Sequence, residues 1–132
     1  MSKVINTSGK RKEAVARATL KKGNGHVIIN GESIELQEPK LYRMRMKEPL
    51  LLAGDVAKKV NITVKTKGGG IAGQADAVRL AIAKALAEHD KKLEDVFAEY
   101  DRLLLVADSR RKETTKPNRQ GQARAKRQKS YR

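Results

Sequence analysis

A glycine-rich segment is the first candidate for ligand-binding chemistry. Gly68, Gly70 and Gly73 fit the spacing G-x-G-x-x-G, and they follow a stretch with the alternation of a strand and precede one with the period of a helix. In a dinucleotide-binding fold such a loop holds the pyrophosphate, and an acidic residue about 20 positions later ends a second strand and binds the ribose. Glu88 and Asp90 instead fall at the end of the expected helix. The sequence therefore argues against a nucleotide cofactor.

The phosphate-binding loop of nucleoside triphosphatases fits these glycines less well. That loop needs Lys and then Ser or Thr after its last glycine, and here Gln74 and Ala75 follow Gly73. Two interpretations remain open. The glycines form a tight strand-to-helix turn that lets the helix pack closely, or their bare backbone and the N–H groups of the helix N-terminus admit a nucleic-acid phosphate.

The other residue types that carry catalysis are poorly represented. The chain has no Cys, which excludes a disulfide scaffold, a thiolate metal site and a cysteine-dependent enzyme. His26 and His89 each stand alone, without a carboxylate at ligand spacing. The carboxylates between residues 94 and 101 are mixed with Lys and Arg, as on a solvated helix. We expect no catalytic residue, no metal, no cofactor and no small-molecule substrate.

Basic residues are the remaining chemistry, and they are concentrated at the two ends of the chain. The 132 residues hold 30 Lys and Arg against 15 Asp and Glu, a formal charge of +15. Residues 1–22 hold seven basic and one acidic side chain, residues 109–132 hold ten and one, and residues 23–108 hold thirteen of each. Closely spaced cations gain free energy by releasing counterions from phosphates. A polyanion is therefore the predicted partner.

Neither a membrane nor secretion is expected. The longest apolar stretch, residues 50–53, is far shorter than the ~20 residues of a membrane-spanning helix, and the first residues do not have the pattern of a signal peptide. Residues 1–108 have the composition of one globular domain. Residues 109–132 contain no Val, Ile, Leu, Met or Phe, so burial cannot offset the entropy of ordering them. We expect them to form an extended tail that spans up to roughly 80 Å.

Both basic ends are candidates for RNA contact. At the N-terminal end, Lys10, Arg11 and Lys12 precede a strand that carries Arg17, a pattern that also suits a solvated sheet edge. In the tail, cations alternate with Gly, Gln, Asn, Ser and Ala, as in arginine-rich segments that order on RNA. The tail cations are Arg110, Arg111, Lys112, Lys116, Arg119, Arg124, Lys126, Arg127, Lys129 and Arg132. Tyr131 either stacks on a base or is an ordinary exposed tyrosine.

Periodicity predicts the elements that must position these groups. Alternation favours strands at residues 4–7, 14–21, 26–30 and 60–65, and a short buried strand at 103–106. Asn24-Gly25 predicts a hairpin between residues 14–21 and 26–30, and Asn30-Gly31 ends the second of these strands. Helices are expected at 40–47, with Pro49 as a restart and Gly54 as a stop, at 71–89, and around 93–100. The predicted fold class is an α+β layer sandwich.

The helix at 71–89 has a clear apolar face. Ile71, Ala75, Val78, Ile82 and Leu86 recur at steps of three and four residues, which places them on one side. The polar residues of this segment lie off that stripe, namely Asp76, Arg79, Lys84 and Glu88. We therefore expect this helix to bury its apolar face in the core.

The segment Gly68–Leu86 resembles the signature of a ribosomal family, that of the ninth protein of the small subunit. The resemblance includes Gln74, Ala77, Ala81 and Lys84. It extends to four further stretches, namely Gly9–Arg17, Gly23–Gly25, Asn30–Gly31 and Gln128–Arg132. The ending is similar to the archaeal and eukaryotic branch. A general nucleic-acid condensing protein or chaperone, and a small nucleotide-dependent enzyme, are the rival interpretations of the same residues.

The resemblance implies a fold, a place and partners. It implies a four-stranded mixed sheet packed with helices, like the second domain of the fifth small-subunit protein. It also implies that the chain binds rRNA in the head of the cytoplasmic ribosome's small subunit, beside neighbouring head proteins. We expect the domain to contact rRNA through Lys10, Arg11, Lys12, Arg17, Gly68, Gly69 and Gly70, and the tail through its cations up to Arg127. The resemblance also implies that Lys129, Tyr131 and Arg132 approach the peptidyl-site tRNA.

Overall fold

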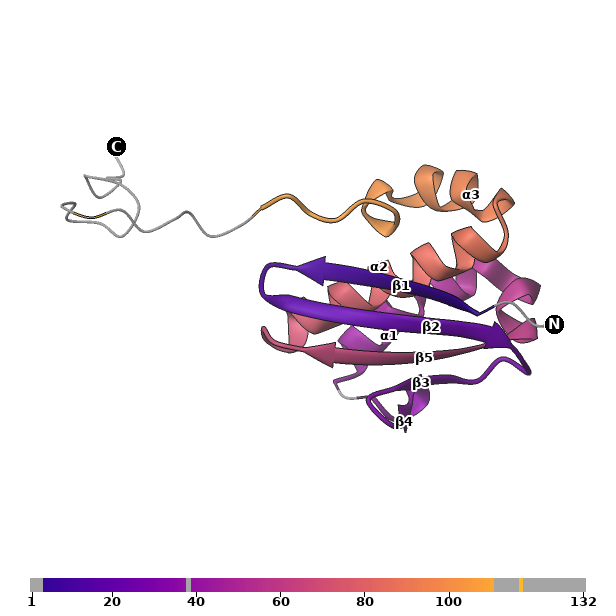
Figure 1. Ribbon diagram of the computed structural model, residues 1–132, viewed down its shortest axis with the longest axis horizontal. Coiled ribbons are helices and arrows are strands. Elements are labelled where there is room, and N and C mark those ends of the chain that lie inside the picture. Colours follow the sequence, from indigo (N-terminus) through magenta and orange to yellow (C-terminus); the bar gives the residue numbers. More distant parts are fainter. Residues whose placement is uncertain (1–3, 38, 111–116, 118–132) are drawn as a thin grey trace.

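A mixed five-stranded sheet is the centre of the molecule (Figure 1). The computed structural model describes residues 4–37, 39–110 and 117. The strands are β1 (Ile5–Arg11), β2 (Ala14–Lys22), β3 (Val27–Ile29), β4 (Glu32–Ser33) and β5 (Val60–Lys67). Their order across the sheet is β1-β2-β5-β3-β4, with β3 parallel to β5 and all other neighbours antiparallel. The predicted α+β class is confirmed.

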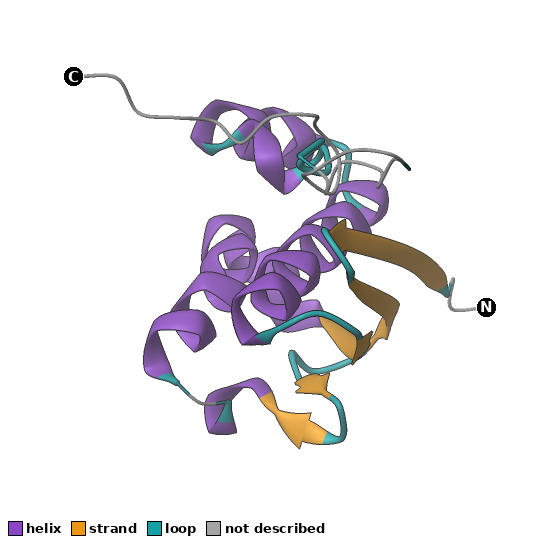
Figure 2. Cartoon of the chain, turned by 90° about the vertical axis from the view of Figure 1, so that its left-hand side faces the viewer, coloured by secondary structure: helices purple, strands orange, loops and turns teal. Residues whose placement is uncertain are grey.

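The helices lie on one face of this sheet and leave the other face open (Figure 2). They are α1 (Lys40–Ala53), α2 (Ile71–His89) and α3 (Lys92–Tyr100), and short 3-10 turns cover Ile34–Leu36, Gly54–Lys59 and Arg102–Leu104. α2 packs against β1 and β2, while α3 lies beyond the β1 edge of the sheet (Figure 1). Across the described residues, the structure contains no helix with the length and apolarity needed to cross a bilayer.

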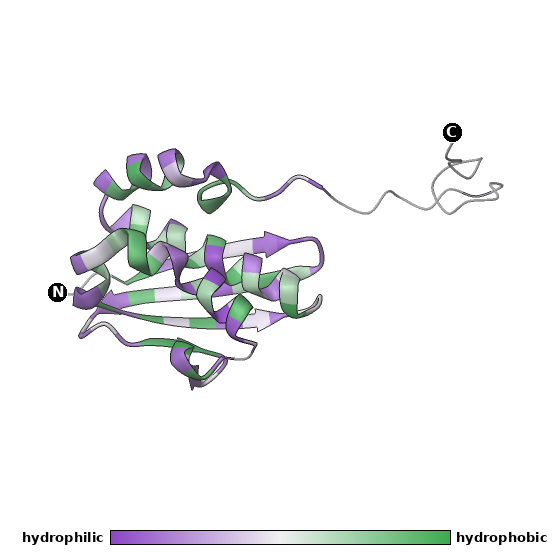
Figure 3. Ribbon diagram, turned by 180° about the vertical axis from the view of Figure 1, so that it is seen from behind, coloured by the Kyte–Doolittle hydropathy of each residue, from purple (hydrophilic) through white to green (hydrophobic). Residues whose placement is uncertain are grey.

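Strand alternation builds the core between the sheet and α2. Ala14, Ala16, Ala18 and Leu20 of β2 point to the helices and are almost fully buried. Small residues on both layers allow a close approach. A Cβ added to Gly9 would lie 2.2 Å from the Ala77 carbonyl oxygen, so β1 meets the backbone of α2 at this point. Seen from behind, the helices lie over the strands, and both layers carry hydrophobic residues there (Figure 3).

The long helix begins and ends where the periodicity predicted, at residues 71 and 89. α1 is longer than predicted, because Pro49 lies within it and does not interrupt it. Gly54 ends α1 with a φ of +61°, the left-handed conformation that favours glycine. Of the predicted apolar face of α2, only Ile71 is exposed, at 61%.

The prediction of a hairpin at Asn24-Gly25 is wrong. β5 lies between β2 and β3, so these two strands are not neighbours. The Asn61 side chain at the start of β5 accepts hydrogen bonds from the backbone N–H groups of Asn24 (3.0 Å) and His26 (3.1 Å). The loop therefore crosses the first residues of β5 instead of closing a pair of strands. The second Asn-Gly does form a hairpin turn, with positive φ at both Asn30 and Gly31, between β3 and β4.

Two further expectations need correction. The segment predicted as a buried strand at 103–106 begins with a 3-10 turn, Arg102–Leu104, whose start the Asp101 carboxylate caps through the Leu103 N–H at 3.0 Å. The sheet has five strands and not the four that the resemblance implies. The two-residue strand β4 lies beyond Asn30-Gly31, where the sequence analysis placed the end of a strand.

Candidate nucleic-acid interface

The basic residues predicted around the β1–β2 hairpin do not share one surface. Lys10 and Arg17 lie on the open face of the sheet, where Arg17 stands between Ser8 of β1 and Lys65 of β5. Lys12 lies in the two-residue turn that joins the strands, with a φ of +55°. Arg11 points to the opposite, helix-covered side. The structure thus brings together Lys10 and Arg17 and separates Arg11 from them.

Arg11 is engaged by carboxylates of its own chain. Its Nη1 forms an ion pair with Asp108, and its Nε lies 3.6 Å from a carboxylate oxygen of Asp76 on α2. Asp76 is also paired with Arg45 of α1 at 2.8 Å. The guanidinium of Arg11 is therefore held in a network that joins β1, α1, α2 and the segment after α3.

The glycine turn packs against the β1–β2 hairpin. Gly68 and Gly69 have φ values of +78° and +65°. A Cβ on Gly68 would lie 2.6 Å from the Glu13 carbonyl oxygen, and one on Gly69 would lie 2.9 Å from Cβ of Ala14. These positions require glycine for backbone geometry and close packing, as the first interpretation predicted. Gly70 is the N-cap of α2, and a Cβ added there would have no atom within 4 Å, so packing does not require glycine at this position.

Arg79, which lies off the apolar stripe of α2, is a buried charge. It is 6% exposed, and it binds Glu48 of α1 through Nε at 2.8 Å and Nη2 at 2.7 Å. Its Nη2 also lies 3.0 Å from Asp101, which follows α3. One guanidinium thus ties three helices together. In the sequence, Arg79 is the only charged residue between Ala77 and Ala83, but this pattern does not by itself show that its side chain is enclosed.

The two carboxylates at the end of the domain are held in their ionised form. Burial opposes the charge of Asp101, but the Leu103 N–H and the Arg79 guanidinium outweigh it, so its pKa lies below the ordinary value. The pKa of Asp108 is also lowered, because Arg110 donates side-chain and backbone hydrogen bonds to it and Arg11 adds positive charge. Asp108 therefore links Arg110, at the start of the predicted tail, to β1.

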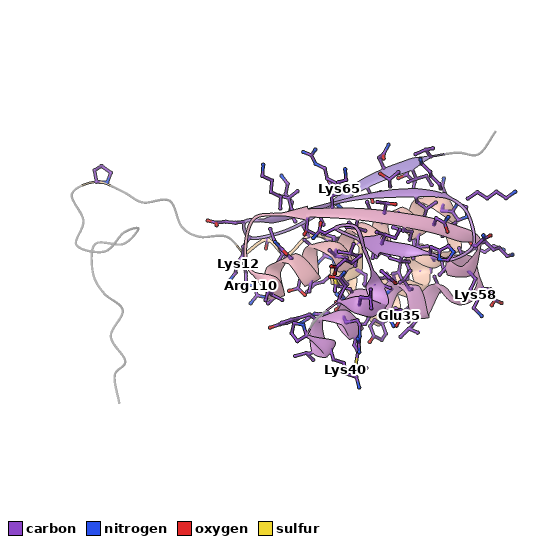
Figure 4. The ribbon with its side chains drawn as sticks, turned by 90° about the horizontal axis from the view of Figure 1, so that it is seen from below. Lys12, Glu35, Lys40, Lys58, Lys65 and Arg110 are labelled. Carbon is purple, nitrogen blue, oxygen red and sulfur yellow. The ribbon has the colours of Figure 1, made fainter. Side chains whose placement is uncertain are left out.

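Most of the predicted tail lies outside the described residues. Arg110 is the one predicted tail cation within them, and Figure 4 shows it at the same end of the sheet as Lys12. The predicted residues that lie outside the described part are Arg111, Lys112, Lys116, Arg119, Arg124, Lys126, Arg127, Lys129, Tyr131 and Arg132.

The open face of the sheet carries three cations beyond those predicted to contact RNA. Lys65 and Lys67 extend from β5, and Lys21 extends from β2, on the same side as Lys10 and Arg17. Figure 4 shows Lys65 on the side of the sheet away from the helices, with Lys40 on the opposite side of the molecule. In the strand predicted at residues 60–65, Lys65 alternates with the apolar residues Ile62 and Val64, which places it on the side away from the core. Only the sheet order shows that it lies next to Arg17.

Together these features define a class of protein. One face of the sheet is covered by helices, the other is polar and cationic, and the described residues contain no cluster of three or more His, Cys, Asp or Glu that could hold a metal. This is an α+β domain suited to a polyanionic partner.

Comparison with known proteins identifies the family. The family model described as "Ribosomal protein S9/S16" matches residues 9–132. Two relatives, each named "Small ribosomal subunit protein uS9", come from strains C7 and C5 of Methanococcus maripaludis. Each is 48% identical over 133 residues, which cover 98% of this chain and 99% of the relative. The chain belongs to the Ribosomal protein S9/S16 family. It is a structural constituent of the small subunit of the cytoplasmic ribosome and not an enzyme.

Proposed function

We propose that the domain of this chain docks on rRNA in the head of the small subunit, and that residues 109–132 form a tail that extends to the peptidyl-site tRNA. Binding of rRNA is general for the family. One observation supports the arrangement most directly: the described chain leaves the domain at the end of the sheet that also carries Lys12 and the glycine turn. A domain contact and a tail can thus begin from the same edge.

The residues proposed for the domain contact are Lys10, Lys12, Arg17 and the glycine turn, Gly68–Gly70. Arg11 was predicted with them, and its ion pairs with Asp76 and Asp108 give it a second role in holding the hairpin to the helices. In the tail, the proposed rRNA contacts are the cations from Arg110 to Arg127. Lys129, Tyr131 and Arg132 are the proposed tRNA-proximal residues.

Salt dependence tests the rRNA contact. If six to ten phosphates are neutralised, raising salt from about 50 to about 200 mM weakens binding roughly 10³- to 10⁵-fold. Binding of the full chain to rRNA that does not change with salt would contradict the proposal. Competition with duplex DNA distinguishes a general condensing protein, which would bind DNA and rRNA equally well.

A truncation tests the tail. Deleting residues 129–132 should lower the affinity of peptidyl-site tRNA, while the shortened chain still sediments with small subunits through a high-salt wash. The matched control replaces Lys129 and Arg132 by Gln, which keeps the length and removes the charge. Unchanged tRNA affinity in both variants would count against the tail, and loss of sedimentation by the full chain would count against the whole proposal.

A further inference from the structure

The open face of the sheet has a charge pattern that neither the glycine turn nor the tail accounts for. One row across the strands contains Ser8, Arg17 and Lys65, and the next contains Lys10, Val15 and Lys67. Lys21 extends this surface toward the other end of β2. Within the described residues, β1, β2, β3 and β5 place no carboxylate on this side.

Unopposed cations on neighbouring strands are unfavourable for the isolated domain. Arg17 and Lys65 are directly opposite each other, and like charges in that position destabilise a sheet. In the described part of the chain, none of the five cations on this face forms an ion pair, whereas Arg11, Arg45 and Arg79 on the helix side do. An anion bound across the strands would relieve the repulsion, so the pattern points to a polyanionic partner.

The uncharged residues of this face indicate which kind of polyanion would bind to it. Asn6, Thr19 and Thr63 form a third row, and the Thr19 hydroxyl donates to the Asn6 side chain at 3.0 Å. The strands place no aromatic side chain here, so bases have nothing on which to stack. Double-stranded RNA is recognised mostly through its shape, its phosphates and its 2′-hydroxyls. Lysines, arginine, hydroxyls and amides supply those contacts.

A groove marks one edge of the cationic sheet surface. It runs along the β1 edge, has a volume of about 960 Å³, and is lined by Ser8, Arg17 and Lys65 together with Lys84 and Lys91. Glu88 and Glu94 line its far side, on the α2 and α3 side. Lys84 and Lys91 on that side only balance these carboxylates, so the excess of positive charge that favours an RNA backbone lies over the strands and not over α3.

We propose that this sheet face docks the sugar-phosphate backbone of a double-helical RNA segment, without reading its bases. The proposal rests on the proposed function, which supplies RNA as the partner, and adds which RNA structure is bound and by which surface. The surface consists of Lys10, Arg17, Lys21, Lys65, Lys67, Asn6, Ser8, Thr19 and Thr63. An acidic protein is the competing occupant, and the experiments below separate the two.

Lysine acetylation of the full chain tests the surface directly. The probe is an RNA duplex of about 16 base pairs and arbitrary sequence, and modified lysines are identified by mass spectrometry. Lys21, Lys65 and Lys67 should become several-fold less reactive when the duplex is bound, while Lys40 and Lys58, on other sides of the molecule, stay reactive (Figure 4). Unchanged reactivity of Lys65, or equal protection by a single strand of the same length, would overturn the proposal.

Charge reversal gives a second, independent measurement. In the double variant Arg17→Glu with Lys65→Glu, like charges remain opposite each other, so thermal unfolding should change little while the log–log salt slope of duplex binding falls by about 2. The matched control, Lys40→Glu with Lys58→Glu, changes net charge equally and should leave the slope unchanged. Equal slopes in the two variants would show a general charge effect and overturn the proposal.

Assembled small subunits separate this inference from the function on which it rests. If the chain sediments with subunits but Lys65 stays reactive there, the proposal for the sheet face is contradicted and the proposed function is not. If the chain does not sediment, the proposed function fails. Protection of Lys65 that ribonuclease removes supports RNA as the occupant, and protection that survives ribonuclease identifies a protein and overturns the proposal.

Discussion

The two sides of this sheet differ in whether their basic side chains form ion pairs. On the helix side, Arg79 is buried between Glu48 and Asp101, and Arg45 and Arg11 share Asp76. On the open side, Arg17 and Lys65 stand opposite each other with no carboxylate among the described strand residues of that face. Basic residues therefore occupy two kinds of environment in this chain. Paired cations join the helices to one another and to β1, whereas the five cations of the open face form no ion pair among the described residues.

The strongest test of this contrast removes one arginine from each side. Arg79→Ala removes a buried guanidinium and leaves Glu48 and Asp101, whose side chains are 32% and 37% exposed, without their partner, so the free energy of unfolding should fall by about 2 kcal/mol. Arg17→Ala is the same chemical change on the open side and should shift it by no more than about 0.5 kcal/mol. Urea denaturation measures both. Equal losses would remove the distinction between the two sides.

Adjacent residues of β1 give the next test. Gly9→Ala introduces a Cβ at 2.2 Å from the Ala77 carbonyl oxygen and 2.8 Å from the Ala81 nitrogen, so β1 must move away from α2. We expect a loss of about 2 to 3 kcal/mol. Ser8→Ala, on the open side, is the control and should be nearly neutral. A Gly9→Ala variant with the parent's melting temperature would contradict the close approach of the two layers.

Acid should weaken the paired side. The pKa values of Asp101 and Asp108 are lower in the folded chain than their ordinary value of about 3.9. Their stabilising contribution is therefore complete above about pH 4 and is lost as the pH falls toward the folded-state values. Urea midpoints between about pH 5 and pH 2.5 measure this loss. Asp101→Asn should flatten the dependence, whereas Asp55→Asn, at an exposed carboxylate, should leave it as in the parent.

The smallest expected effect has opposite signs in two assays. Lys65→Glu places a carboxylate opposite Arg17 and should stabilise the domain by about 0.5 kcal/mol, while it weakens binding to the RNA duplex. Lys65→Gln is the control that removes the charge without adding a new partner, and it should stabilise less. If Lys65→Glu destabilised the domain, the cation pair would not be a source of strain.

Local signals in the sequence were enough for elements whose contacts are local. The period of Ile71–His89 gave that helix, and Gly54 gave the end of α1. The pairing of distant strands could not be predicted from local signals. Asn24-Gly25 has the pattern of a hairpin turn, but Asn61 of β5 accepts hydrogen bonds from the backbone of this loop. The same limit applied to the site. Arg17 was predicted from its own strand, but its neighbour Lys65 is 48 residues away along the chain and is brought beside it only by the sheet order.

Buried polar chemistry was the other part that the pattern did not predict. Arg79 falls off the apolar stripe, and only the packing of α1 and α3 over α2 shows that it is enclosed. Sequence periodicity describes one helix against one surface. It fails where a helix is covered on several sides, as α2 is between the sheet and the other two helices.

Asp108 has a mechanical consequence. Because its carboxylate holds both Arg11 of β1 and Arg110, tension applied from beyond residue 110 passes directly into a strand of the sheet. Without this contact the same pull would first reach the 3-10 turn at Arg102–Leu104 and then α3, which is joined to the rest of the domain at its edge. The ion pair therefore sets which part of the fold bears the load when the C-terminal segment is pulled.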